Sequence, residues 1–412
     1  MNRPQVFTGI DIGSATVRVV VAQKEPQSDE VKILGVGAVP MRGMQKGVIT
    51  DVDAAVEALS AARDMAERVS GIMVEKAYVS INGSHLTSQN LRGVIAVSRA
   101  DGEITPDDVD RVINAAQAIS MPPNREILHV LPQNYIVDGQ EHISDPIGMT
   151  GVRLEVEAHI IEGSVPFIKN LTKVVNQSGV HIEDFVFAPL AAAMAVLEKR
   201  QKELGVVLVD LGAGTTSMVV YEEDTLLHTS VLPVGASHIT NDIAIGLRTS
   251  IDIAEAMKVS HGTAIPESVP QNESIAVEDE EGEEESVSRR DVATMISDRL
   301  DELFQFIDRE LKHIGRSGIL PAGVILTGGG AHMDGIVELA KKKLRLPVRI
   351  GRPKMLTGIS DRTDEPEYAV GIGLIHFAIE QENRPSGRES LHLPNVAATM
   401  DKMRGWVKTF LP

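Results

Sequence analysis

Hydrophobic and polar positions along the first part of the chain predict strands followed by a helix. Runs rich in β-branched residues predict an antiparallel meander over residues 6 to 12, 17 to 22 and 31 to 39. Thr50 or Asp51 can then cap a helix, whose single apolar stripe continues until Gly71 ends it.

A strand pattern returns at residues 79 to 81, and the character of the chain changes over residues 84 to 160. Short strand-like runs there surround one helix, which Thr105 and Pro106 open as N-cap and first helical residue, so the segment indicates an inserted subdomain. The elements predicted beyond it are a helix at 165 to 178, a strand at 181 to 187, a helix at 189 to 203 and a strand at 206 to 210. This alternation is typical of a mixed or parallel sheet with crossover helices, and it predicts the α/β class.

Polar segments interrupt the second part of the chain. Residues 278 to 285 hold seven acids in eight positions, which favours a solvated hairpin tip or a mobile loop over a metal site, because a cation needs converging ligands. A long helix is predicted over residues 291 to 314. The stretch from 381 to 395 is polar, with Pro, Gly and Ser, and predicts a flexible linker.

Composition limits the classes of function. The chain has 412 residues, 43% of them hydrophobic, which is enough for about two to four compact units. Its 40 Lys and Arg against 58 Asp and Glu leave a net charge of −18, which argues against nucleic acid as the main partner. The absence of cysteine excludes disulfides and Cys-ligated zinc. With no secretory signal pattern and no run of about 18 apolar residues, any membrane contact is expected to be peripheral.

One short motif occurs twice. Asp11-Ile12-Gly13-Ser14 and Asp210-Leu211-Gly212-Ala213-Gly214-Thr215-Thr216 each follow an apolar strand and precede another. A glycine turn lets backbone N–H groups approach phosphate oxygens, and the preceding Asp can hold Mg²⁺ through water. A single Asp-x-Gly is most simply an ordinary turn. Two copies, with a strand that runs into Gly328, Gly329 and Gly330, favour a nucleotide site without a Walker lysine.

These three elements, in this order, resemble the superfamily of actin, sugar kinases and DnaK-type chaperones. The resemblance implies an ATP cleft between two similar halves, with Asp11 and Asp210 positioning Mg²⁺. The ATP-binding residues that it implies are Asp11, Gly13, Ser14, Asp210, Gly212, Gly214, Thr215, Thr216, Glu255, Lys258, Gly328, Gly329 and Gly330. Glu255 and Lys258 would serve the ribose and base, although Glu and Lys three apart on a helix also form common surface salt bridges.

Within this superfamily, residues 131–139, 145–154 and 158–161 resemble the hallmark stretch of FtsA, the actin-like bacterial cell-division family. The implied fold is actin-like, with an inserted subdomain that replaces the small subdomain of actin's first half. The implied division is a first domain over 1–83, 161–204 and 351–380, the inserted subdomain over 84–160, a second domain core over 205–240 and 315–350 with its subdomain over 241–314, a linker over 381–395 and an amphipathic helix over 396–412.

Some positions depart from the patterns of these families. Ala213 and Ser217 stand where the FtsA family usually has Gly and Asp, so phosphate contacts can differ in detail. Ala188 stands where chaperones and MreB carry Glu before a proline, and where actin has Gln in the corresponding region, to orient the attacking water. A methyl group cannot accept a proton. We therefore expect tight ATP binding with at most slow hydrolysis.

The last residues predict an amphipathic helix. Its apolar face carries the only tryptophan of the chain, and cations flank that face, which is the composition of a helix lying in a membrane interface. The predicted membrane-binding residues are Met400, Lys402, Met403, Arg404, Trp406, Val407, Lys408, Phe410 and Leu411. The alternative is a helix docked on its own domain or on a partner subunit.

The FtsA resemblance also implies partners and a location. It implies filaments of the protein itself, recruitment of later division proteins, and a place on the cytoplasmic face of the cell membrane at the division site. It further implies binding of the FtsZ C-terminal tail at Arg299 and Glu302, which could equally be a plain surface pair. The rival interpretations are a pilus-assembly adaptor with the same ATP loops, and a soluble ATPase of the sugar-kinase or chaperone type.

Overall fold

The computed structural model describes residues 4–25, 30–118, 122–278, 284–354, 356–358 and 363–383. Three predicted segments lie wholly or partly outside these described residues: the amphipathic helix at 396–412, the linker from residue 384 to 395 and the centre of the acidic run at 279–283. In the described part of the chain, no helix is both long and apolar enough to cross a membrane.

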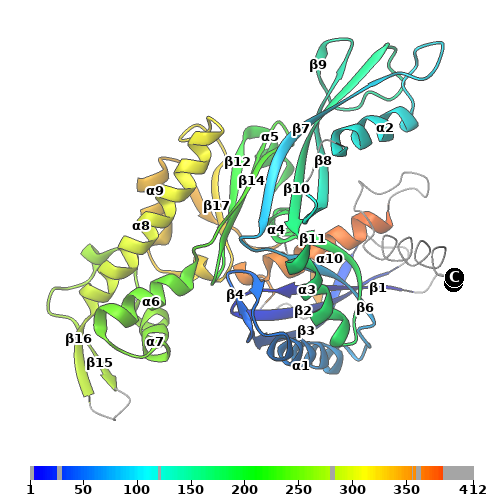
Figure 1. The fold of residues 1–412 in the computed structure, drawn as a ribbon. Coiled ribbons are helices and arrows are strands. Elements are labelled where there is room, and N and C mark those ends of the chain that lie inside the picture. Colours follow the sequence, from blue (N-terminus) through cyan, green and yellow to red (C-terminus); the bar gives the residue numbers. More distant parts are fainter. Residues whose placement is uncertain are drawn as a thin grey trace.

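The first half is built on a sheet whose strands lie in the order β11-β6-β1-β2-β3-β19 (Figure 1). The strands are β1 (Gln5–Ile12), β2 (Thr16–Lys24), β3 (Val31–Pro40), β6 (Lys76–Ile81), β11 (His181–Phe187) and β19 (Thr357–Gly358). The predicted meander is confirmed, since β2 pairs antiparallel with both β1 and β3. β6 and β11 extend the sheet with parallel pairing, so β1, β6 and β11 end at one edge.

Helices cover both faces of this sheet. α1 (Val52–Ser70) packs on β3, where a side chain at Gly37 would collide with the backbone of Ala62, and α10 (Ala369–Glu382) packs on β1. The predicted ends of α1 are confirmed, because the Asp51 carboxylate accepts the N–H of Ala54 and Gly71 adopts a positive φ of 70°.

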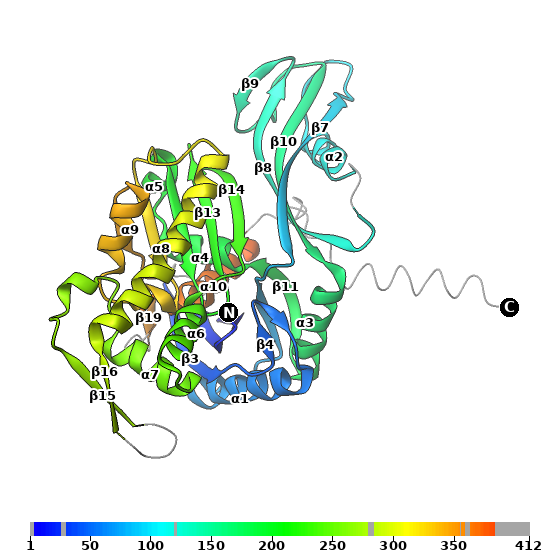
Figure 2. The ribbon, with the colours of Figure 1, turned by 60° about the vertical axis from the view of Figure 1, so that its left-hand side comes forward.

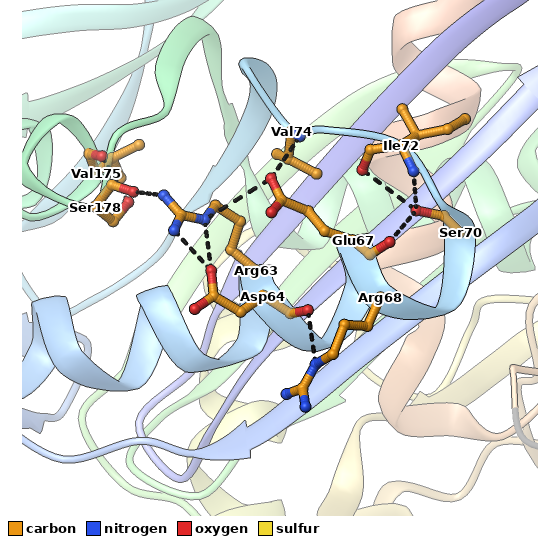
Figure 3. A network of polar contacts seen from close by, with 9 residues as sticks. All are labelled: Arg63, Asp64, Glu67, Arg68, Ser70, Ile72, Val74, Val175 and Ser178. Carbon is orange, nitrogen blue, oxygen red and sulfur yellow. Dashed lines mark hydrogen bonds and ion pairs between the residues drawn. The ribbon is translucent and has the colours of Figure 1, made fainter.

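The end of α1 is fixed to the end of α3 (Val165–Gln177) by polar contacts (Figure 3). The Arg63 guanidinium donates to the carbonyl of Ser178 and pairs with Glu67, whose carboxylate accepts the N–H of Val74 at 2.7 Å. These polar contacts therefore position the two helices against each other, together with apolar packing.

The inserted subdomain is a sheet in the order β7-β10-β8-β9 with one helix (Figure 1). Its elements are β7 (Leu86–Ala96), α2 (Pro106–Gln117), β8 (Arg125–Val137), β9 (Gln140–Ile143) and β10 (Arg153–Ser164). Its apolar side chains form a core of their own, and α2 begins at Pro106 with Thr105 as its N-cap, as predicted. The short strand-like runs expected here are parts of longer strands.

The second half repeats the plan of the first half. Its sheet has the order β14-β13-β12-β17-β18, formed by β12 (Val206–Leu211), β13 (Thr216–Glu222), β14 (Thr225–Leu232), β17 (Gly323–Thr327) and β18 (Val348–Ile350). β12 pairs antiparallel with β13 and parallel with β17, as β1 does with β2 and β6. The helices α6 (Ala236–Leu247), α7 (Ile251–His261), α8 (Arg289–His313) and α9 (Ile336–Leu344) and the hairpin of β15 (Ser274–Glu278) and β16 (Glu284–Ser288) complete it (Figure 2).

One predicted element is wrong. The helix expected at 189 to 203 is two helices, α4 (Ala188–Val196) and α5 (Lys199–Leu204), because Leu197 and Glu198 are extended between them. The Gln201 side chain accepts the N–H of Glu198 at 2.8 Å and so helps to start the second helix.

Candidate functional site

The two Asp-Gly turns lie against each other between the two halves. Asp11 is near the end of β1 and Asp210 near the end of β12, and a turn follows each strand. A Cβ atom built on Gly214 would lie 2.7 Å from Oγ of Ser14 and 2.9 Å from the backbone nitrogen of Lys46. The structure therefore brings the two predicted phosphate loops together, and only glycine fits at the point of closest approach.

The two turns close in the same way. The N–H of Gly13 donates to the carbonyl of Thr16 at 3.1 Å, and the N–H of Gly212 donates to the carbonyl of Thr215 at 3.0 Å. Thr216 is fully buried and its hydroxyl donates to a main-chain carbonyl at 2.8 Å. The internal repeat in the sequence thus corresponds to a repeated local geometry.

The carboxylates of Asp11 and Asp210 are both buried. Burial, with the nearby Asp11 charge, raises the pKa of Asp210 to about 7 against a weaker opposing effect of Arg18. Burial also raises the pKa of Asp11, while Arg18 and a 2.9 Å hydrogen bond from the Ser80 hydroxyl act in the opposite direction. Two acids that are costly to ionise together fit a divalent cation, which would stabilise both charges.

The triple glycine lies beside the second turn. Gly328 follows β17, has φ 80°, and would place a Cβ only 2.3 Å from a carboxylate oxygen of Asp210. A Cβ on Gly330 would collide with the side chain of Leu211, whereas one on Gly329 would meet nothing within 4 Å. The third predicted element is therefore joined to the second, with open space at its middle glycine.

Glu255 and Lys258 lie on α7, facing α6. Nζ of Lys258 is 2.6 Å from Oε2 of Glu255, 2.8 Å from Oγ1 of Thr240 and 3.5 Å from the carbonyl of Ala236. The N–H of Ala236 in turn donates to the carbonyl of Gly212 at 2.9 Å. Glu255 and Lys258 thus form the salt bridge that their spacing offered as the alternative interpretation. Lys258 is also connected through Ala236 to the second turn.

Ala188 is buried at the first position of α4, at the sheet edge where β11 ends. Its methyl group offers nothing to polarise a water molecule.

Several polar residues near the two turns are not predicted by the sequence motifs. Ser80 accepts the N–H of Ile12 and donates to Asp11, and the amide of Asn82 donates to the hydroxyl of Ser217 at 3.0 Å across the two halves. The available signal was the polar pair flanking Ile81 at the end of an apolar strand.

Arg299 and Glu302 lie on α8 and interact with each other. The Arg299 guanidinium also makes two hydrogen bonds to Asp242 on α6, of 2.6 and 2.8 Å. The side chains of Arg299 and Glu302 are partly exposed.

Comparison with known proteins places these features in context. Residues 207–373 match the family described as cell division protein FtsA, and residues 83–162 match the SHS2 domain inserted in FTSA. A cell division protein FtsA from Pseudomonas aeruginosa is 34% identical over 410 residues, with 98% of each chain covered. One from Bacillus subtilis is 38% identical over 398 residues, covering 96% of this chain and 89% of the relative.

Solved structures resemble the chain at low sequence identity. The PilM-PilN type IV pilus biogenesis complex matches with a TM-score of 0.66 at 14% identity, covering 90% of this chain and 98% of the other. MreB5 of Spiroplasma citri bound to ADP matches with a TM-score of 0.53 at 14% identity, covering 92% and 99%. These matches confirm the predicted actin-like fold with its inserted subdomain.

Proposed function

The chain belongs to the family of the cell-division protein FtsA, and on this premise we propose that it binds ATP with magnesium between its two halves. We propose further that it forms filaments on the cytoplasmic face of the cell membrane at the division site, tethers FtsZ filaments there and recruits later division proteins. Family membership does not favour the pilus-assembly and soluble-ATPase alternatives.

The observation that carries nucleotide binding is the contact between the two Asp-Gly turns. Ser14 and Gly214 come from different halves and touch, so phosphate oxygens held by one turn would be within reach of the other. Asp11 and Asp210 would hold Mg²⁺, which offsets phosphate charge when bound. Two solved structures of one protein of similar fold, MreB5 of Spiroplasma citri, are bound to ADP and to AMPPNP.

The residues of this chain would bind and orient the nucleotide rather than activate water. Backbone N–H groups of the turns would donate to the phosphates, and the glycines after β17 would border the adenosine. Because Ala188 cannot serve as a general base, hydrolysis is slow in this proposal.

Nucleotide binding is tested by Asp210→Ala. Loss of this carboxylate should weaken binding of a fluorescent ATP analogue with Mg²⁺ by roughly tenfold to a hundredfold, because a charged partner is removed. Asp53→Ala is the matched control, since Asp53 is exposed in the first turn of α1. Equal binding by both variants would exclude the proposed site.

Membrane tethering rests on the residues at 400–411 and is tested separately. Trp406 is the only tryptophan, so its emission reports on this segment alone. Titration with anionic vesicles should shift the emission to the blue, and more strongly with ATP and Mg²⁺ if filaments increase avidity. Emission that is already blue-shifted and indifferent to lipid would mean that the segment packs on protein.

A further inference from the structure

A cluster of three metal-ligating side chains lies outside the proposed nucleotide site. His332, Glu365 and Glu367 each offer a ligand atom, and these atoms all lie within 4.8 Å of one another. Among the described residues it is the one such group of three or more His, Asp or Glu side chains. We call these three residues the His–Glu cluster.

The cluster joins two segments far apart in the sequence. His332 ends the short helix η2 (Gly329–His332) after β17, and the two glutamates flank Pro366 at the start of η3 (Pro366–Tyr368), which leads into α10. The Pro366 carbonyl accepts hydrogen bonds from the Thr327 hydroxyl at 3.0 Å and from the N–H of Gly328 at 3.2 Å. The main chain therefore holds the two segments next to each other.

The side chains of the cluster contact each other and one arginine. Nε2 of His332 and Oε2 of Glu367 are 2.6 Å apart. Oε2 of Glu365 is shielded from solvent and has no hydrogen bond among the described residues, although it lies 3.0 Å from a guanidinium nitrogen of Arg352 in an ion pair. The His332 side chain is 46% exposed, which leaves space for water as a further ligand.

From this geometry we propose that the His–Glu cluster binds one Zn²⁺ ion. One imidazole nitrogen and two carboxylate oxygens are ligands that zinc accepts at about 2.0–2.2 Å, with water completing a tetrahedron. The imidazole ligand favours zinc over magnesium, which prefers oxygen ligands in an octahedron. The bound ion links η2, which follows the sheet of the second half, to η3 and α10, which packs on the sheet of the first half.

Cobalt is a suitable probe because it accepts the same ligands and absorbs visible light. The full chain, stripped of metal and then supplied with excess Mg²⁺ to occupy any oxygen-only site, is titrated with Co²⁺ and then with Zn²⁺. We expect one Co²⁺ per chain, displaced by Zn²⁺ because zinc lies above cobalt in the affinity order for nitrogen and oxygen ligands, apart from geometry. His332→Ala and Glu367→Gln should each weaken Co²⁺ binding by more than the roughly 10- to 100-fold that is typical when a hydrogen-bonding partner of a metal ligand is removed.

Two controls keep this proposal separate from the nucleotide site. His181→Ala removes an exposed histidine elsewhere and should leave the cobalt spectrum unchanged. Asp210→Asn should also leave it unchanged, whereas it would abolish the signal if cobalt occupied the paired aspartates. Unchanged binding by His332→Ala, with its fold checked by circular dichroism, would overturn the proposal.

Discussion

Among single residues, Asp210 is buried in an environment that disfavours its charged form. Burial and the neighbouring Asp11 raise its pKa to about 7, from an ordinary value of 3.8. The folded chain therefore keeps a proton that the unfolded chain loses, and stability should fall as pH rises from about 4 to about 7. The loss would be on the order of 3 kcal/mol if this shift acted alone. Urea unfolding of the metal-free and nucleotide-free protein at about pH 5 and pH 7.5 measures it.

Asp210→Asn isolates this effect because an amide does not ionise. The variant should lose the part of the pH dependence that Asp210 contributes and exceed the wild-type protein in stability at about pH 7.5. Asp224→Asn, in an exposed turn of the second half, should behave like wild type. Mg²⁺ should stabilise the wild-type protein more at the higher pH, because a cation favours the ionised pair. An identical pH profile for Asp210→Asn would contradict the assignment.

The sequence predicts the two aspartates of the proposed site but not the polar residues that hydrogen-bond around them. Asp11 and Asp210 could be predicted because each ends an apolar strand before a glycine turn, a pattern that is local in the chain. Ser80 and Asn82 could not be assigned in this way, since their partners Asp11 and Ser217 lie in other strands. Their roles depend on the parallel pairing of β6 with β1 and on the contact between halves.

Among the elements, α8 carries a prediction that concerns the proposed FtsZ-tail site. Arg299 is held by Asp242 on α6 through two hydrogen bonds, so any group of the tail that binds the Arg299 guanidinium has to compete with this carboxylate. If Arg299 binds the tail, Asp242→Asn should strengthen binding of a labelled FtsZ C-terminal peptide. Arg299→Ala should weaken that binding by about tenfold or more. Fluorescence anisotropy measures both changes.

Arg309→Ala is the matched control on the same helix, because Arg309 is exposed and contacts the ring of Phe306. It should leave peptide binding unchanged. A purely structural Arg299–Asp242 pair gives a different result, in which both variants lower the free energy of unfolding and neither alters the affinity for the peptide.

Elements with strong end signals could be predicted closely, and elements without them could not. α1 and α2 begin at side-chain caps that the sequence displays, and both were located. The break between α4 and α5 cannot be predicted from the sequence, because Leu197 and Glu198 are compatible with a continuous helix. Their extended backbone separates the two helices. The two-residue strands β4 (Met44–Gln45) and β5 (Val48–Ile49) are too short for a periodic pattern, although their turn brings the backbone of Lys46 close to Gly214.

At the scale of the whole molecule, the inserted subdomain is connected to both halves. It continues from the first half through β7 and β10, and it also contacts β14 at the edge of the second sheet (Figure 2). The Ser88 hydroxyl donates to the carbonyl of Thr229 at 2.9 Å, and the buried His159 ring lies 2.9 Å from the Thr229 hydroxyl. A change in the angle between the halves therefore has to alter these contacts. Binding of a ligand that favours one angle between the halves should thus have a measurable effect on the inserted subdomain.

Thr229→Val tests this connection. Burial lowers the pKa of His159 to about 3, so the ring is neutral, and loss of the Thr229 hydroxyl leaves its Nε2 without that partner. The free energy of unfolding should fall by about 1–3 kcal/mol, as expected for an unsatisfied buried polar group. Thr225→Val makes the same chemical change on β14, where the hydroxyl donates to the nearby carbonyl of Glu223, and should have little effect. Hydrogen exchange should show that ATP with Mg²⁺ protects β7 and β10 in the wild-type protein and less so in Thr229→Val. Equal protection in both proteins would mean that the inserted subdomain does not respond to the nucleotide through β14.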